Sequence, residues 1–280
     1  MQTHDTVPAM QTLARDTRAA GQTIAFVPTM GALHEGHLDL IRLAATQGDV
    51  VVVSIFINPT QFGPNEDFER YPRDIDGDLA KCREAGAHHA FLPERSPLLP
   101  DDYSTYITEE AVAEPLEGVS RPAFFRGVTT IVAKLFNIVQ PHVAIFGQKD
   151  AQQLAVIRKM VNDLHFPVEI VAGKTTRDAD GLALSSRNAY LTASQREGAL
   201  GINRTLNQIK TMVDQGERRA ERLVAEATHL LADDRRIRII YVAAVDPATM
   251  KKQTEIEPGN SLMAIAIWMD QTRLIDNILL

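Results

Sequence analysis

The segment from Phe26 to His37, Phe-Val-Pro-Thr-Met-Gly-Ala-Leu-His-Glu-Gly-His, constrains the fold of this chain more than any other stretch. The apolar run 24–27 that leads through it is typical of a buried parallel strand, and Gly31 suits a tight turn after that strand. Apolar residues then recur at helical spacing from about His34. A strand, a glycine turn and a helix start form an anion site, because the first N–H groups of a helix lack partners and its dipole favours negative charge.

Two histidines stand at that helix start. His34 and His37 are three residues apart, so both side chains leave the same side of the first turn, and Gly36 leaves room for a ring or a phosphate. Surface histidines or a metal-binding pair are the simpler alternatives, although the zinc-protease and dinucleotide-binding patterns do not match this spacing. The segment resembles the His-Ile-Gly-His signature of nucleotidyltransferases and class I aminoacyl-tRNA synthetases, which bind ATP at this turn.

Composition excludes several classes of protein. The chain has 280 residues, enough for one large domain or two modest ones, and a net charge of -7 with no basic stripe, so nucleic acid is not an expected partner. The single cysteine, Cys82, suits a reducing compartment. No signal-peptide pattern and no membrane-spanning apolar run is evident. We therefore expect a cytoplasmic protein that does not bind a membrane.

Strand and helix patterns alternate through the first part of the chain, which predicts an α/β fold with a Rossmann-like, doubly wound parallel sheet. The expected strands are 24–27, 50–57, 89–92, 143–146 and 168–172. The expected helices are 8–20, 34–47, one that is capped near Asp74 and ended by Gly86, and 128–140.

The pattern changes after about residue 176. A capping box at Thr192 begins a helix that reaches about Asp214, and a second helix over 218–232 has Leu223, Ala227 and Leu230 as its apolar stripe. The apolar runs 237–245 and 262–269 follow, and 272–280 alternates weakly. We expect two domains, a Rossmann-like domain over 1–175 and a smaller α+β domain over 176–280.

Polar candidates follow the expected strands. Gln61 lies in the loop after 50–57, where ligands bind in open α/β sheets. Lys149 and Asp150 follow 143–146, and a lysine at the positive end of a helix favours an anionic ligand. Asp150 can equally cap that helix, and Gln153 lies one turn further on.

Three further groups are less specific. The Pro- and Gly-rich stretch 93–127 is long for a connection. Near its end it contains Arg121 and Arg126. Either arginine could hold a carboxylate or phosphate, or simply lie in solvent.

Tyr71-Pro-Arg73 precedes the helix capped at Asp74. Ser185, Ser186 and Arg187 combine small donors with a cation that can grip phosphate.

Taken in order, these motifs resemble the pantothenate synthetase family, the pantoate–β-alanine ligases of coenzyme A biosynthesis, nearly from end to end. The segments that match are Val27–Gly31, His34–His37, Ser54–Phe62, Tyr71–Arg73, Phe125–Val128, Lys149–Asp150, Asp180–Asn188 and Arg273–Asn277. The resemblance implies an AMP-forming ligase. Pantoate would attack the α-phosphate of ATP to give pantoyl adenylate and pyrophosphate, and β-alanine would then displace AMP.

The resemblance also implies the site. Catalysis would fall to His37, His34 and Lys149, and pantoate and β-alanine would be held by Gln61, Gln153, Arg121 and Tyr71. ATP would be bound by Met30, Gly31, Ala32, Leu33, His34, Glu35, Gly36, His37, Gly147, Gln148, Lys149, Asp150, Thr176, Leu184, Ser185, Ser186 and Arg187. Mg²⁺ would arrive on the ATP phosphates, with no dedicated metal site in the protein, and the family forms homodimers.

Two positions depart from the family pattern. Phe124 stands where relatives usually have histidine, and Gln148 stands where they usually have glutamate. Another adenylyl-transferring enzyme of the superfamily, or a non-catalytic nucleotide-binding homologue, therefore remains an alternative. We also expect the C-terminal domain to be a lid, with Ser185, Ser186 and Arg187 at its hinge.

Overall fold

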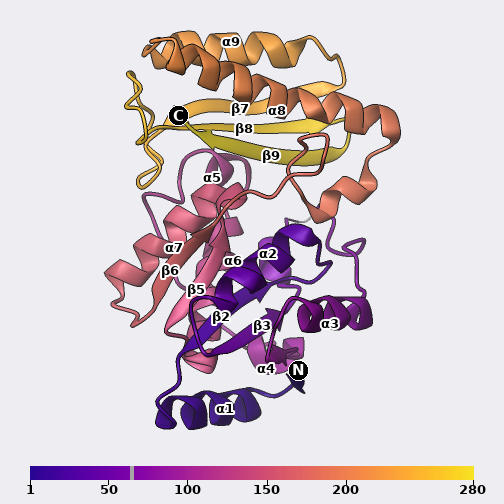
Figure 1. The fold of residues 1–280 in the computed structure, drawn as a ribbon, viewed down its shortest axis with the longest axis vertical. Helices are drawn as coiled ribbons and strands as arrows, with labels where there is room; N and C mark the ends of the chain where they lie inside the picture. The colour runs from indigo at the N-terminus through magenta and orange to yellow at the C-terminus, as the bar shows by residue number, and fades with distance from the viewer. Residues whose placement is uncertain (64–65) are drawn as a thin grey trace.

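The computed structural model describes residues 1–63 and 66–280, which form two stacked units (Figure 1). The larger, N-terminal unit is built on a six-stranded parallel sheet, and the smaller, C-terminal unit on a three-stranded antiparallel sheet. The predicted α/β class, with a smaller α+β part at the C-terminus, is confirmed.

The order of strands in the parallel sheet is β1-β4-β3-β2-β5-β6. The strands are β1 (Gln2–His4), β2 (Ile24–Thr29), β3 (Val50–Ile55), β4 (His89–Phe91), β5 (Val143–Gly147) and β6 (Glu169–Gly173). From β2 the chain builds outward to β3 and β4 on one side, and β5 and β6 are added on the other. The strand order therefore reverses between β2 and β5, where their carboxyl ends leave a crevice suited to a ligand.

Helices cover both faces of this sheet because alternate side chains of each strand point to opposite faces. Phe26 and Val52 belong to a core shared with α1 (Val7–Ala19), α6 (Phe124–Val139) and α7 (Ala151–Asp163). On the other face, the neighbouring Val27 and Val53 share a core with α2 (Glu35–Ala45) and α3 (Ile75–Glu84). Short helical segments lie in the connections: η1 (Pro59–Gln61), α4 (Arg95–Leu98), α5 (Glu117–Ser120), η2 (Gln148–Asp150) and η3 (Ser186–Tyr190).

The C-terminal unit has its helices on the outer side of its sheet (Figure 1). Its elements are α8 (Ala193–Asp214), α9 (Ala220–Ala232), β7 (Ile237–Val245), β8 (Leu262–Met269) and β9 (Thr272–Leu279). Met263 and Ile265 share a core with both helices, whereas Leu262 and Ala264 point the other way and join the core of the N-terminal unit. The same sheet thus packs on its own helices and on the larger unit.

Several expected boundaries were wrong. The strand predicted at 24–27 continues through Pro28 to Thr29. Proline is tolerated there because β5 pairs only with Ala25 and Phe26, so no partner on that side needs an N–H from residue 28. The strand predicted at 50–57 ends at Ile55.

The remaining differences concern helices and one strand. The helix predicted from Val128 begins at Phe124, the apolar stripe of α9 uses Leu231 in place of Leu230, and β1 was not expected. Strand β1 has only three residues and no apolar run, and it pairs with β4 at the edge of the sheet. Among the described residues, no helix is long and apolar enough to cross a membrane.

Candidate active site

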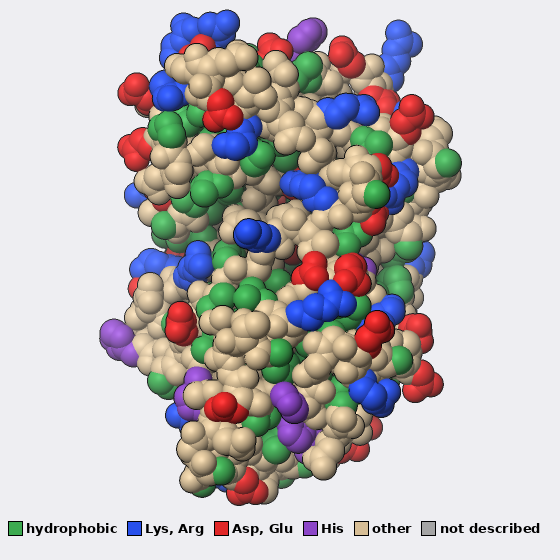
Figure 2. Space-filling view, viewed as in Figure 1, with side chains coloured by type: hydrophobic (Ala, Val, Ile, Leu, Met, Phe, Trp, Pro, Cys, Tyr) green, Lys and Arg blue, Asp and Glu red, His purple; other side chains and the backbone are tan. Residues whose placement is uncertain are grey.

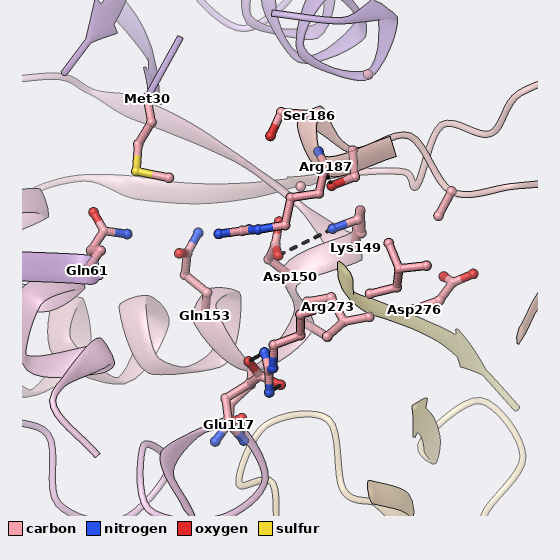
Figure 3. A pocket seen from close by; sticks show the side chains of 18 of the residues that line it. Met30, Gln61, Glu117, Lys149, Asp150, Gln153, Ser186, Arg187, Arg273 and Asp276 are labelled. Carbon is pink, nitrogen blue, oxygen red and sulfur yellow. Dashed lines mark hydrogen bonds and ion pairs between the residues drawn. The ribbon is translucent and has the colours of Figure 1, made fainter. Parts of the chain in front are cut away.

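A cavity of about 350 Å³ lies between the two units at the carboxyl ends of β2 and β5 (Figure 3). Predicted site residues that line it are Met30, His34, Gly36, His37, Gln61, Tyr71, Arg121, Gly147, Lys149, Asp150, Gln153, Thr176, Leu184, Ser185, Ser186 and Arg187. Gly31, Ala32, Leu33, Glu35 and Gln148 do not line it. The fold thus brings segments from both units to the point where the strand order reverses.

The turn after β2 is fixed by hydrogen bonds to the buried carboxylate of Asp78. Gly31 and Ala32 have positive φ angles of 80° and 52°, and the N–H groups of Ala32 and Leu33 donate to the two oxygens of Asp78 at 2.8 and 2.7 Å. A Cβ on Gly31 would lie 2.9 Å from an Asp78 oxygen, so glycine is needed there. Lys81 donates to the Leu33 carbonyl at 2.7 Å. These residues shape the turn and leave His34 and His37 facing the cavity.

Asp78, which is only 1% exposed, was not among the residues expected from the sequence. The sequence does contain one indication that Asp78 is buried. It stands four residues before Cys82, so the two side chains lie on the same face of the expected helix, and Cys82 is buried. A carboxylate on the inward face of a helix needs donors, and here the donors come from a turn more than forty residues earlier in the chain.

The two histidine rings lie against each other, with centroids 4.1 Å apart. The His34 N–H donates to Nδ1 of His37 at 3.3 Å, so the neutral His37 ring carries its proton on Nε2. Nδ1 of His34 is buried and has no hydrogen-bond partner among the described residues.

Both rings are neutral near pH 7. Burial, with a contribution from Lys149, lowers the pKa of His34 to about 4. Burial, then His34 and Lys149, lowers the pKa of His37 to about 3. At neutral pH these side chains therefore offer N–H donors to an anion and do not add positive charge.

Lys149 is positioned by the C-terminal unit. Asn277 on β9 donates to the carbonyls of Gln148 and Lys149 at 3.0 and 2.8 Å. The Lys149 ammonium lies 3.7 Å from a carboxylate oxygen of Asp150 (Figure 3). Asp150 occupies the position before α7, but its side chain makes no capping hydrogen bond, so the cap alternative does not account for it.

Gln61 has one end of its amide fixed. Its Oε1 accepts from Asn58 at 3.0 Å, and Asn58 also donates to the carbonyl of Gly127 at 3.1 Å. The NH₂ group of Gln61 is left for the cavity, where Gln61, Gln153 and Met30 surround one part of the space (Figure 3). An amide with one end anchored is a pre-set donor for a hydroxyl or a carboxylate.

Three arginines of the cavity wall are paired with carboxylates. Arg121 donates to Glu66, Arg187 to Asp67, and Arg273 to Glu117, in each case through two nitrogens. Arg121 and Arg187 were expected as ligand-binding cations, but these partners were not foreseen. Arg126, the other candidate cation of that stretch, lies over the ring of Tyr106 at 3.7 Å and does not line the cavity.

Glu117 is the most deeply fixed of those carboxylates. It is 5% exposed, accepts from the Tyr241 hydroxyl at 2.8 Å, and its N–H donates to Gln152 at 3.0 Å. Burial and the neighbouring Glu117 hold the pKa of Tyr241 well above its ordinary value, so that hydroxyl stays a donor. This buried network ties α5 to β7 and β9 and closes one end of the cavity.

The tip of the connection between β6 and α8 touches the N-terminal unit at several points. Thr176 donates to Asp39 on α2 at 2.7 Å, and the Ser186 and Tyr71 hydroxyls lie 3.3 Å apart. With the Arg187–Asp67 pair, these contacts hold the predicted phosphate-binding segment, including Ser186 and Arg187 (Figure 3), in the wall of the cavity that His37 also lines.

Acidic and basic side chains are interspersed over the face shown in Figure 2. Within residues 1–63 and 66–280, no three His, Cys, Asp or Glu side chains group as metal ligands.

Comparisons with known proteins show which family this chain resembles. Residues 2–279 match the family model described as pantoate-beta-alanine ligase. The chain is 50% identical over 276 residues to pantothenate synthetase of Syntrophobacter fumaroxidans, covering 99% of this chain and 97% of that one. It is 49% identical over 280 residues to that of Moorella thermoacetica, covering 100% and 99%.

Solved structures give the same result. Pantothenate synthetase from Thermus thermophilus superposes with a TM-score of 0.93 at 40% identity, covering 100% of this chain and 99% of that one. Pantoate-beta-alanine ligase from Francisella tularensis, whose structure is described as complexed with beta-gamma ATP and beta-alanine, gives 0.81 at 33% identity, covering 100% and 97%.

Proposed function

Since the chain belongs to the pantoate–β-alanine ligase family, we propose that it joins pantoate to β-alanine through a pantoyl-adenylate intermediate. One observation carries this proposal: His34, His37 and Lys149 meet Gln61 and Gln153 in a single cavity at the reversal point of the sheet. Donors suited to a triphosphate thus adjoin amides suited to a hydroxy acid.

In the first step the pantoate carboxylate attacks the α-phosphorus of ATP, and the bond to the pyrophosphate oxygen breaks. The protein contributes by positioning the reactants and by stabilising the charge that develops on the phosphates. The Nε2–H of His37 and the ammonium of Lys149 would donate to those oxygens, together with backbone N–H groups in the first turn of α2. Gln61 and Gln153 would hold the pantoate hydroxyls.

In the second step the amine of β-alanine attacks the carbonyl carbon of the adenylate. The carbon–oxygen bond to AMP breaks, AMP leaves with the bonding electrons, and the nitrogen loses a proton. A cavity enclosed by both units would keep water away from the adenylate, which hydrolyses readily. The complex described for the Francisella relative supports ATP and β-alanine as ligands of this site.

Magnesium fits this arrangement as a companion of ATP. It would be held by phosphate oxygens, with the exposed carboxylate of Asp150 available beside Lys149, and it would neutralise phosphate charge. A homodimer and a cytoplasmic location are further proposals that rest on the family alone.

We also propose that the C-terminal unit, over residues 176–280, closes as a lid on the unit over 1–175. The support is the set of contacts that already cross the cavity, Arg187 with Asp67, Ser186 with Tyr71 and Thr176 with Asp39. A loop that grips phosphate and also bridges two units couples their closure to ATP binding.

An isotope experiment tests the adenylate. Pantoate labelled with heavy oxygen in its carboxylate is incubated with ATP, magnesium and β-alanine, and AMP is recovered. Attack on the α-phosphorus predicts one labelled oxygen in AMP, because the acyl–oxygen bond breaks in the second step. Label in inorganic phosphate together with ADP would show an acyl phosphate and overturn the proposed pathway.

A further inference from the structure

One side chain of the C-terminal sheet holds the backbone on both sides of Lys149. The amide nitrogen of Asn277, on β9, donates to the carbonyl of Gln148 at 3.0 Å and to the carbonyl of Lys149 at 2.8 Å. The first carbonyl belongs to the peptide plane before the Cα of Lys149, and the second to the plane after it. Because the φ and ψ angles of a residue are the rotations of those two planes, the two hydrogen bonds set the direction in which the lysine side chain leaves the backbone.

The turn that carries Lys149 gives it little support. Lys149 lies in η2, a single 3₁₀ turn of three residues, and hydrogen bonds in such turns have poorer geometry than those of an α-helix. Asp150 makes no side-chain capping hydrogen bond at the start of α7. Its carboxylate is 46% exposed and lies 3.7 Å from the lysine ammonium, so this ion pair constrains the lysine weakly. The firm point in these surroundings is Asn277.

Asn277 is itself buried and fixed. It is 7% exposed and lies opposite Ala264 in the pairing of β8 with β9. Its N–H donates to Asp276 at 2.8 Å, and Asp276 accepts from two nitrogens of Arg177 at 2.6 and 3.0 Å. The amide of the Gln148 side chain lies 3.5 Å from Oδ1 of Asn277, which leaves the Asn277 nitrogen facing the two carbonyls.

We propose that Asn277 is a positioning residue for Lys149, and that contact between β9 and the N-terminal unit is therefore a condition for the first chemical step. This inference rests on the proposed function. A lid that only shields the adenylate from water would act after the adenylate has formed. Here the lysine that stabilises phosphate charge takes its direction from a residue 128 positions further along the chain, in the other unit. The phosphate site is complete only while the two units are in contact.

The size of the effect follows from the lysine side chain. A misplacement of about 1 Å in a catalytic group can cost about 100-fold in rate. Lysine has a flexible four-carbon stem, so its rotamers can absorb part of a backbone displacement. We therefore expect loss of the Asn277 amide to slow adenylate formation about tenfold, less than the 10²–10³-fold typical when a charge-stabilising group is removed altogether.

Asn277→Ala tests the positioning role. The substitution leaves the backbone pairing of β9 in place and removes both hydrogen bonds to η2. Single-turnover formation of pantoyl adenylate from ATP, magnesium and pantoate, without β-alanine, is expected to slow about tenfold at saturating substrates. Ser261→Ala is the matched control, because it removes a buried hydrogen bond to the N–H of Glu257 within the same unit and away from the cavity. An unchanged rate in Asn277→Ala, or equal slowing in the control, would overturn the proposal.

A double-mutant cycle with Lys149→Ala shows whether Asn277 acts through the lysine. If it does, Asn277→Ala will change the residual rate of the Lys149→Ala protein by less than about twofold, since the group that it positions is already gone. A further tenfold loss in that background would overturn the proposal. If the alanine variant does not fold, Asn277→Asp, which keeps the size of the side chain but has no N–H donor, takes its place in both experiments. Absence of adenylate in the wild type would refute the proposed function, whereas its presence confines any failure to this inference.

Discussion

At the scale of single residues, His37 is a fixed hydrogen-bond donor. Its Nδ1 accepts from the backbone of His34, and its lowered pKa, about 3, keeps the ring neutral at ordinary pH. A neutral ring stabilises phosphate charge through Nε2–H and does not act as a strong acid. Of the two chemical roles open to this side chain, proton donor or charge stabiliser, the geometry therefore favours the second.

Replacement of His37 separates these roles. His37→Ala should slow adenylate formation about 10²–10³-fold, the usual effect of losing one pre-organised donor. His37→Gln, whose amide nitrogen falls near the position of Nε2, should recover more activity than His37→Asn, whose amide is shorter. Single-turnover formation of the adenylate measures this, and equal loss in the glutamine and asparagine variants would show that the proton itself is transferred.

Stability should depend on pH through the same rings. Histidine has an ordinary pKa of 6.5, and those of His34 and His37 in the fold are about 4 and about 3. As pH falls from 6.5 towards 4, the unfolded chain binds protons that the folded chain does not, so the free energy of unfolding falls in that window. Above pH 6.5 both states are neutral and the effect vanishes.

The free energy of unfolding is measured with urea at pH 6.5 and at pH 4, the two ends of that window. His37→Gln should lose less stability between them than the wild type, because one of the depressed histidines is gone. An identical loss in both proteins would mean that His37 is not desolvated in the fold.

At the scale of elements, α3 supports the turn after β2 although it contributes no residue to the cavity. Asp78→Asn keeps the shape of the side chain but turns one acceptor into a donor that faces the N–H of Ala32 or Leu33. The free energy of unfolding should fall by about 1–3 kcal/mol, the usual cost of an unsatisfied buried group. ATP affinity should fall too, since the turn no longer holds His34.

Asp76→Asn on the exposed side of the same helix is the control. Unfolding in urea and calorimetric titration with ATP give the two readouts. If Asp78→Asn lowers the free energy of unfolding but leaves ATP affinity unchanged, Asp78 has a structural role only.

The elements themselves could largely be predicted from sequence, because buried parallel strands and amphipathic helices leave strong local patterns. The strands β2, β3 and β5 and the capped helices α3 and α8 were predicted in this way. Strand β1 leaves no pattern, and the start of α6 is hidden in a long connection.

The polar partners of the site could not be predicted. Asp78, Glu66, Glu117 and Asn277 act on residues far away in the chain, and only the fold brings them together. A sequence motif indicates which residues face a ligand. The side chains that hydrogen-bond to those residues and fix their positions have no constant spacing from them in the sequence.

At the scale of the whole molecule, the two units share the site. Asn277 supports the backbone around Lys149, and Arg187 reaches from the C-terminal unit to Asp67. If that unit closes on the nucleotide, ATP with magnesium should slow amide exchange over residues 182–190, and Arg187→Ala should abolish this protection. Arg222→Ala on α9, outside the cavity, is the control. Unchanged exchange at saturating ATP would mean that the loop is a static part of the site.

The most direct test of the central claim is pantoate-dependent exchange of labelled pyrophosphate into ATP in the absence of β-alanine. If pantoyl adenylate forms in this cavity, the wild type will catalyse the exchange, it will require pantoate, and AMP will be released in quantity only when β-alanine is added. Lys149→Ala should abolish the exchange, because the ammonium beside the helix start is lost. Pantothenate formation without any such exchange, or exchange that is independent of pantoate, would contradict the account.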